Sequence, residues 1–179
     1  DLYDAADSQR LISLVLRELD LDPKRFPPGA VSHRISGAKN ELLDAEAFAA
    51  SVNENNPYDR AIAEVYTRYS QRLREANALD FDDLIMRTVQ LLQTRPAVAE
   101  MYRRRFRHVL VDEYQDTNHA QYVLVRELVG LETDADGVEP SELCVVGDAD
   151  QSIYAFRGAT IRNIEEFERD FPSAETVLL

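Results

Sequence analysis

The 179-residue sequence has no tryptophan, a single cysteine, Cys144, and only two lysines, Lys24 and Lys39. One cysteine excludes an internal disulfide and is typical of a reducing compartment, so we expect a cytoplasmic protein. No apolar run approaches the roughly 20 residues needed to cross a bilayer, so no membrane partner is expected. A G-x-x-x-x-G-K-S/T phosphate loop is also missing, because neither lysine follows a glycine or precedes serine or threonine.

Basic residues are outnumbered by acidic ones, and the formal net charge is −13. Residues 1–77 carry 13 acidic and 10 basic residues, whereas residues 78–179 carry 20 acidic and 10 basic residues. Because nucleic-acid phosphates bind basic surfaces, the net charge gives no support for a nucleic-acid partner. Any such site would have to be a local patch on an acidic chain.

Helical periodicity dominates the first part of the chain. Apolar residues that share one face predict helices over 8–19, over 31–42 and after Pro57. Ser8 is the expected N-cap of the first of these helices, because its hydroxyl can accept a hydrogen bond from the first turn. The pattern therefore predicts an all-helical subdomain over residues 1–77.

The remainder of the chain, residues 78–179, changes from helical to alternating patterns. Two helices, beginning near Asp80 and at Pro96, come first. The predicted elements after them are a strand over 108–111, a helix over 118–129, a strand over 143–146, a helix through 161–167 and a strand over 176–179. Such alternation is typical of a parallel sheet. We therefore predict a mixed α/β, mainly helical fold, in which a partial parallel sheet of about three strands with flanking helices follows the helical subdomain.

Two adjacent carboxylates, Asp112 and Glu113, directly follow the first predicted buried strand. Ligands of parallel α/β sheets bind at the carboxyl ends of the strands. One carboxylate there can hold Mg²⁺ through its water shell, and the other can orient or deprotonate an attacking water. Gln151 follows the second strand, and its amide can contact a phosphate and a water together. A purely structural interpretation stays open, in which both carboxylates only end the strand and cap the helix after Asn118.

The segment QSIYAFRG at 151–158 places two aromatic rings and a cation close together. Tyr154, Phe156 and Arg157 are suited to stacking on unpaired bases and contacting a phosphate, which indicates a single-strand site. The alternative is that both rings belong to the hydrophobic core.

Two long motifs resemble those of a known family. VDEYQDT at 111–117, followed by VGDADQSIYAFRGA at 146–159, closely resembles motifs II and III of the UvrD/PcrA/Rep-type superfamily 1 DNA helicases. Upstream, LDFDDL at 79–84 resembles the family's segment that enters the first RecA-like subdomain. ISGAKNEL at 35–42 resembles the helical accessory subdomain called 1B. The resemblance therefore covers nearly the whole chain.

The family resemblance implies two subdomains and an ATP-driven motor. Residues 1–77 would be the 1B-like accessory subdomain, and residues 78–179 would be the C-terminal part of the RecA-like motor subdomain 1A. The parent protein would couple ATP hydrolysis to movement on single-stranded DNA and to duplex unwinding, with 3′–5′ polarity and a role in repair or replication. Its cofactors would be ATP and Mg²⁺, and its partners would be DNA and repair or replication proteins at the bacterial nucleoid.

The resemblance also implies roles for individual residues. Asp112 would coordinate Mg²⁺ together with Glu113, and Glu113 would activate the hydrolytic water. Gln151 would sense the γ-phosphate. Three side chains would contact the single strand: Tyr154, Phe156 and Arg157. Phe156 stands where relatives often have tryptophan. Lys39 is expected either at duplex DNA or in solvent on an accessory helix.

The chain begins at Asp1 and ends within the apolar run 177–179, so we expect a piece of a longer protein. In the family the phosphate loop precedes the accessory subdomain, and it would therefore lie before Asp1. The piece alone is then expected to lack ATPase activity. Two alternatives stay open, an AddA/RecB-like helicase–nuclease subunit and a non-catalytic nucleic-acid-binding module.

Overall fold

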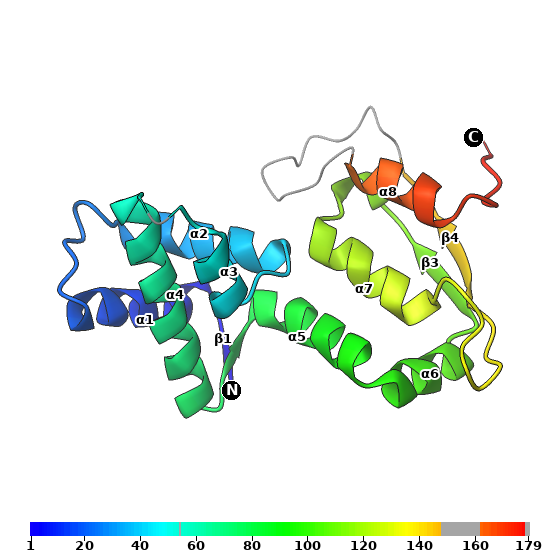
Figure 1. Ribbon diagram of the computed structural model, residues 1–179, viewed down its shortest axis with the longest axis horizontal. Coiled ribbons are helices and arrows are strands. Elements are labelled where there is room, and N and C mark those ends of the chain that lie inside the picture. The colour runs from blue at the N-terminus through cyan, green and yellow to red at the C-terminus, as the bar shows by residue number, and fades with distance from the viewer. Residues whose placement is uncertain (54, 148–161, 178–179) are drawn as a thin grey trace. The chain divides into compact units, whose positions relative to one another are not determined.

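The computed structural model describes residues 1–53, 55–147 and 162–177. The chain divides into two compact units, Asp1–Met86 and Arg87–Leu179. Helices predominate, and the described strands form parallel two-stranded sheets, which confirms the predicted mixed α/β, mainly helical class (Figure 1). None of the described helices is both long and apolar enough to cross a membrane.

The first unit contains the helices that the periodicity predicts, together with short elements that it does not. Its described elements are β1 (Leu2–Tyr3), α1 (Ala5–Glu18), α2 (Pro28–Asn40), α3 (Ala45–Ser51), α4 (Pro57–Glu75), β2 (Leu79–Asp80) and the start of α5 (Phe81–Thr94). β1 pairs in parallel with β2, so this unit is not purely helical. The two units divide within α5, whereas the sequence pattern places the subdomain boundary after residue 77.

The N-terminus of α1 corrects the cap expected from the sequence. Asp4, rather than Ser8, is the N-cap, and it forms a capping box with Asp7. Its Oδ1 accepts a hydrogen bond from the backbone N–H of Asp7 at 2.8 Å. Ser8 lies inside the helix and is buried. A carboxylate four residues earlier therefore satisfies the free N–H groups of the first turn.

The core of the first unit is formed by the apolar faces of α1, α2 and α4, which pack on one another. Val15, Val31 and Ile62 are completely enclosed. Tyr66 of α4 is also buried, and its hydroxyl donates to the Leu43 carbonyl at 2.9 Å. The hydroxyl of this buried tyrosine therefore has a hydrogen-bond acceptor in the loop before α3.

The second unit carries the predicted parallel strands. After α5, its described elements are α6 (Pro96–Arg105), β3 (His108–Val111), a 3-10 turn η1 (Tyr114–Asp116), α7 (His119–Val129), β4 (Glu142–Val145) and α8 (Arg162–Asp170). β3 and β4 are paired in parallel, with His108 opposite Glu142 and Val111 opposite Val145.

The expected third strand is not seen among the described residues. Thr176 and Val177 have no strand conformation, and residues 178–179 lie outside the described part of the chain. Val177 is 77% exposed. An apolar β-branched residue forms a strand only where a neighbouring strand pairs with it. The local pattern at 176–179 therefore predicts a strand that the described residues 176 and 177 do not form.

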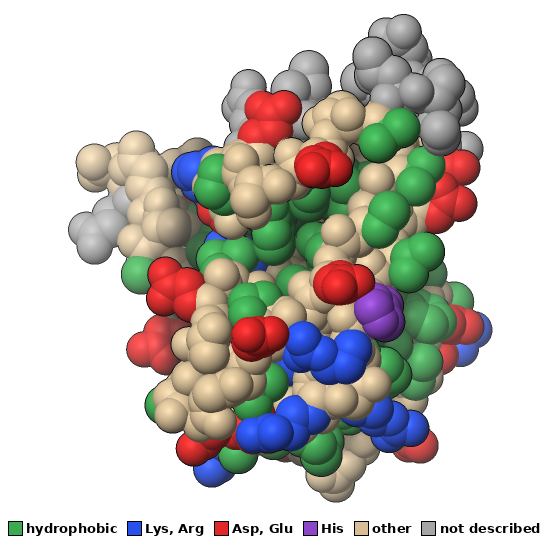
Figure 2. Space-filling model, turned by 90° about the vertical axis from the view of Figure 1, so that its right-hand side faces the viewer, with side chains coloured by type: hydrophobic (Ala, Val, Ile, Leu, Met, Phe, Trp, Pro, Cys, Tyr) green, Lys and Arg blue, Asp and Glu red, His purple; other side chains and the backbone are tan. Residues whose placement is uncertain are grey.

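One face of the β3–β4 pair is open to solvent in this chain. Leu110 is 78% exposed, and its register partner across the ladder is Cys144, which is also exposed. Figure 2 looks onto the side on which β4 lies in Figure 1 and shows hydrophobic side chains gathered on that surface. Burial alternates along both strands, as a sheet covered on one face requires.

Candidate functional site

The carboxyl ends of β3 and β4 lie side by side. The backbone N–H of Val146 donates to the Val111 carbonyl at 2.8 Å, and the N–H of Tyr114 donates to the Val146 carbonyl at 3.0 Å. The chain after β3 therefore turns across the end of β4. This edge of a parallel sheet is where ligands of α/β proteins bind.

Asp112 and Glu113 are both exposed at this edge. Glu113 has φ 50° and ψ 40°, a left-handed conformation that costs a residue with a Cβ roughly 1–2 kcal/mol. Its backbone N–H donates to Oδ1 of Asp112 at 2.8 Å. Its Oε2 accepts a hydrogen bond from Nε2 of Gln115 at 2.7 Å. The two carboxylates thus have local contacts, and both residues remain exposed.

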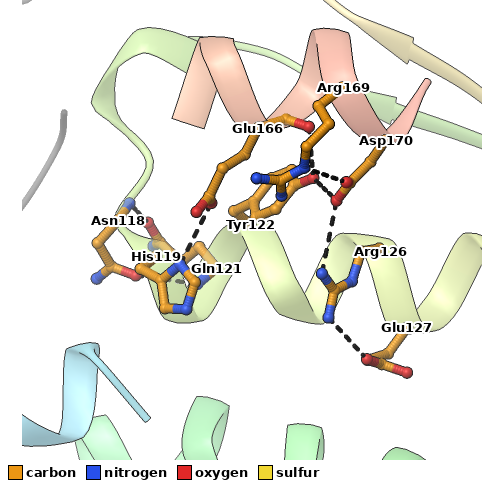
Figure 3. A network of polar contacts seen from close by, with 9 residues as sticks. All are labelled: Asn118, His119, Gln121, Tyr122, Arg126, Glu127, Glu166, Arg169 and Asp170. Atoms are coloured by element: carbon orange, nitrogen blue, oxygen red, sulfur yellow. Dashed lines mark hydrogen bonds and ion pairs between the residues drawn. The ribbon is translucent and has the colours of Figure 1, made fainter. Parts of the chain in front are cut away.

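Helix α7 is capped without help from either carboxylate. Asn118 is the N-cap, and its Oδ1 accepts from the backbone N–H of Gln121 at 2.9 Å. In return, Oε1 of Gln121 accepts from the backbone N–H of Asn118 at 2.9 Å (Figure 3). This capping box contradicts the interpretation in which Asp112 and Glu113 serve as the cap.

The donor set at this edge fits Mg²⁺. Asp112 and Glu113 supply exposed carboxylate oxygens, which are ligands that Mg²⁺ prefers. Among the described residues, no group of three or more His, Cys, Asp and Glu side chains is arranged to hold a metal ion. Proteins usually bind Mg²⁺ through one or two carboxylates, with water and nucleotide phosphates as the other ligands, so a pair of carboxylates is compatible with that ion.

Helix α8 is fastened to α7 by polar contacts (Figure 3). The hydroxyl of Tyr122 donates to the Asp170 carboxylate and, at 3.1 Å, to the Glu166 carbonyl. Arg126 lies 3.5 Å from the same Asp170 carboxylate, and Nδ1 of His119 lies 3.4 Å from Glu166. Burial raises the pKa of Tyr122, and its hydrogen bond to Asp170 raises it further.

A ring contact joins α8 to the segment that carries the carboxylates. Tyr114 is buried, and its ring meets the ring of Phe167 edge to face at 5.7 Å. Burial raises the pKa of the Tyr114 hydroxyl. The start of α7, the carboxylate segment and α8 thus form one packed group at the end of the sheet.

Four of the predicted site residues, Gln151, Tyr154, Phe156 and Arg157, lie outside the described residues. Their roles in phosphate sensing and single-strand contact therefore remain predictions. The last described residue before them, Gly147, lies against Gln115. The sequence pattern predicts no role for either residue, although Gln115 stands inside the VDEYQDT run.

Lys39 is placed differently from either sequence expectation. Its ammonium lies 2.6 Å from Oδ2 of Asp80 and 3.0 Å from Oδ1 of Asp83, and its side chain is 1% exposed. Tyr69 donates to the same Asp80 oxygen at 2.8 Å. Lys39 is therefore neither solvated nor open to duplex DNA, because two buried carboxylates of the LDFDDL segment take up its charge.

The comparisons with known proteins agree with the motifs. The UvrD/REP helicase N-terminal domain profile matches residues 1–172. The chain is 63% identical over 179 residues to ATP-dependent DNA helicase UvrD1 of Mycobacterium tuberculosis, and 46% identical over 178 residues to ATP-dependent DNA helicase PcrA of Bacillus subtilis. Each match covers 99% of this chain and 23% of the relative, so the chain spans about a quarter of their length. The chain belongs to the UvrD/REP helicase N-terminal domain family.

Proposed function

We propose that the chain is part of an ATP-dependent DNA helicase that couples ATP hydrolysis to movement along single-stranded DNA and to unwinding of duplex DNA. The observation that carries this proposal is the exposed Asp112–Glu113 pair at the carboxyl end of β3, which α7 does not need for its cap. Family membership and the names of the relatives support the same activity. We further propose 3′–5′ polarity and a role in DNA repair or replication at the bacterial nucleoid.

Within the proposed site, Asp112 and Glu113 would hold Mg²⁺, and Glu113 would accept the proton of the attacking water. When bound, Mg²⁺ would neutralise charge on the nucleotide phosphates. Gln151 would report the presence of the γ-phosphate. The single strand would be bound by the side chains of Tyr154, Phe156 and Arg157. Residues 1–77 would act as accessory subdomain 1B, and residues 78–179 as part of motor subdomain 1A.

The Glu113→Gln variant tests the proposal in the full-length protein. We expect hydrolysis of ATP to be lost, while fluorescent-nucleotide titration shows that ATP binding persists, because the amide keeps the shape but cannot accept the proton. Glu142→Gln is the matched control, since Glu142 is exposed at the opposite end of the same sheet. Normal hydrolysis by Glu113→Gln would remove Glu113 as the base.

The 179-residue chain contains no G-x-x-x-x-G-K-S/T loop. We therefore expect the isolated chain to show no DNA-stimulated ATPase activity, because the backbone cradle for the phosphates is missing. A steady-state phosphate-release assay with and without single-stranded DNA measures this directly.

An AddA/RecB-like helicase–nuclease is the second candidate, and nuclease activity of the full-length protein would distinguish it.

A further inference from the structure

Gln115 connects the carboxylate segment to the end of β4. Its side chain is 5% exposed, although it belongs to a polar turn. Nε2 lies 2.7 Å from Oε2 of Glu113. Because an ionised carboxylate only accepts hydrogen bonds, the amide must present its NH₂ group to Glu113, and this fixes which way the amide points.

The opposite end of the amide faces Gly147. A Cβ placed on Gly147 would lie 2.8 Å from Oε1 of Gln115, 3.2 Å from its backbone nitrogen and 3.3 Å from the Cβ of Tyr114. Real Cβ atoms essentially never come within 3.0 Å of another atom, so a larger residue at 147 would require the Gln115 amide to shift. The amide of Gln115 therefore lies between the Glu113 carboxylate and the backbone at the end of β4.

This placement matters because, in the part of the chain that the structure describes, the amide of Gln115 is the hydrogen-bond partner of the Glu113 side chain. Glu113 is exposed, and its backbone has a left-handed conformation. A flexible, exposed glutamate samples many rotamers, and a catalytic group must be held within a fraction of an ångström of its working position. Contact with a buried amide restricts those rotamers.

We propose that Gln115 is a positioning residue for ATP hydrolysis, holding the Glu113 carboxylate at the end of β3, and that glycine is required at 147 to leave room for its amide. The inference rests on the proposed role of Glu113 as the base. Gln115 donates its hydrogen bond to the carboxylate of that base. It acts through Glu113, and it links the VDEYQDT segment to the start of the VGDADQ segment.

The first test is Gln115→Met in the full-length protein, which preserves side-chain length and removes the donor. We expect kcat for DNA-stimulated ATP hydrolysis to fall about 10- to 100-fold, as misplacement of a catalytic group does, with KM for ATP and the thermal midpoint little changed. Gln121→Met is the matched control, because Gln121 forms a side-chain hydrogen bond in the same unit without contacting Glu113. It should keep the kcat of the unmodified protein. An unchanged kcat in Gln115→Met overturns the proposal.

The second test is a double-mutant cycle between Gln115→Ala and Gly147→Ala, which also serves if Gln115→Met fails to fold. Gly147→Ala alone should lower kcat, because its methyl group displaces the amide. With Gln115→Ala already present, Gly147→Ala should lower kcat by less than about a further twofold, because the amide that its methyl group would displace is no longer there. Fully additive losses would show that the two residues act separately, and they would contradict the proposal.

The outcomes separate this inference from the proposed function. If Glu113→Gln abolishes hydrolysis while Gln115→Met hydrolyses ATP normally, only the positioning role fails. If Glu113→Gln hydrolyses ATP normally, Glu113 is not the base, and the positioning role fails with it.

Discussion

The ammonium nitrogen of Lys39 lies 2.6 Å from Oδ2 of Asp80 inside the first unit. Asp80 also supports the start of α5, because its Oδ1 accepts a hydrogen bond from the backbone N–H of Asp83 at 2.9 Å. The carboxylate of Asp83 is the second acidic partner of the lysine, at 3.0 Å. One buried cation therefore ties α2 to the beginning of α5, the helix in which the two units divide.

Lys39→Met should destabilise the chain by about 3–5 kcal/mol, because it leaves two buried carboxylates without their cation. Urea unfolding followed by circular dichroism measures the change. Lys24→Met is the matched control, since Lys24 is exposed, and it should change the free energy of unfolding by less than about 0.5 kcal/mol. Equal stability of the two variants would contradict a structural role for Lys39.

Asn118→Ala should cost about 1 kcal/mol of stability, the usual value for removing an N-cap side chain. Asp112→Asn, a few residues earlier, should change stability by less than about 0.5 kcal/mol, because the cap does not use its carboxylate. Chemical denaturation of both variants checks the pair. A larger loss for Asp112→Asn than for Asn118→Ala would restore the capping role to the carboxylates.

At position 113, glycine should be more stable than alanine. Both Glu113→Gly and Glu113→Ala remove the contact with Gln115, but only glycine relieves the left-handed conformation, so we expect a difference of about 0.5–1 kcal/mol in its favour. At Asp112, which has no positive φ, alanine should be the more stable of the two. Thermal unfolding of the four variants tests whether the order reverses between neighbouring positions.

Tyr122→Phe should weaken the attachment of α8 in a pH-dependent way. Burial acts to raise the pKa of Asp170, but the hydrogen bonds from Tyr122 and Arg169 and the nearby positive charges outweigh it, so the pKa lies below the ordinary 3.8. The stabilisation that the Asp170 carboxylate provides is therefore fully present above the pKa of an aspartate in the unfolded chain. It is lost as the pH falls through the pKa of Asp170 in the folded protein.

We expect the Tyr122→Phe variant to lose about 1.5–3 kcal/mol at pH 7, the usual value for a hydrogen bond to a charged group. The difference from the unmodified chain should shrink as the pH falls below about 4. Urea unfolding at several pH values measures it. Tyr102→Phe is the control, because the Tyr102 ring stacks on Phe106 and lies elsewhere in the unit. A loss for Tyr122→Phe that is the same at pH 3 and pH 7 would exclude the Asp170 carboxylate as the cause.

Local signals were sufficient where neighbouring residues alone decide the structure. Pro57 and Pro96 stand at the first positions of α4 and α6, and Gly130 ends α7, as their backbone preferences predict. β3 has the predicted bounds, because a short β-branched run bounded by polar residues permits few alternatives. The carboxylate pair is predicted in the same way, from its place at the end of that strand.

Features that depend on distant partners could not be predicted in this way. β1 pairs with β2 across more than 70 residues, and neither two-residue strand has a periodicity of its own. The sequence pattern predicts a surface position for Lys39, because its partners, Asp80 and Asp83, follow more than 40 residues later. Gln115 lies in an ordinary turn sequence. Only the three-dimensional structure shows that Gly147 lies against its amide.

The open face of the β3–β4 pair provides the protein with an intrinsic probe. Cys144 is the sole cysteine of the chain, it is exposed, and it lies opposite Leu110 in the ladder. A thiol-reactive dye would therefore label one position of this 179-residue chain, at the surface where the apolar side chains are uncovered. The labelling rate would report how far any additional segment or protein shields that surface, without any engineered substitution.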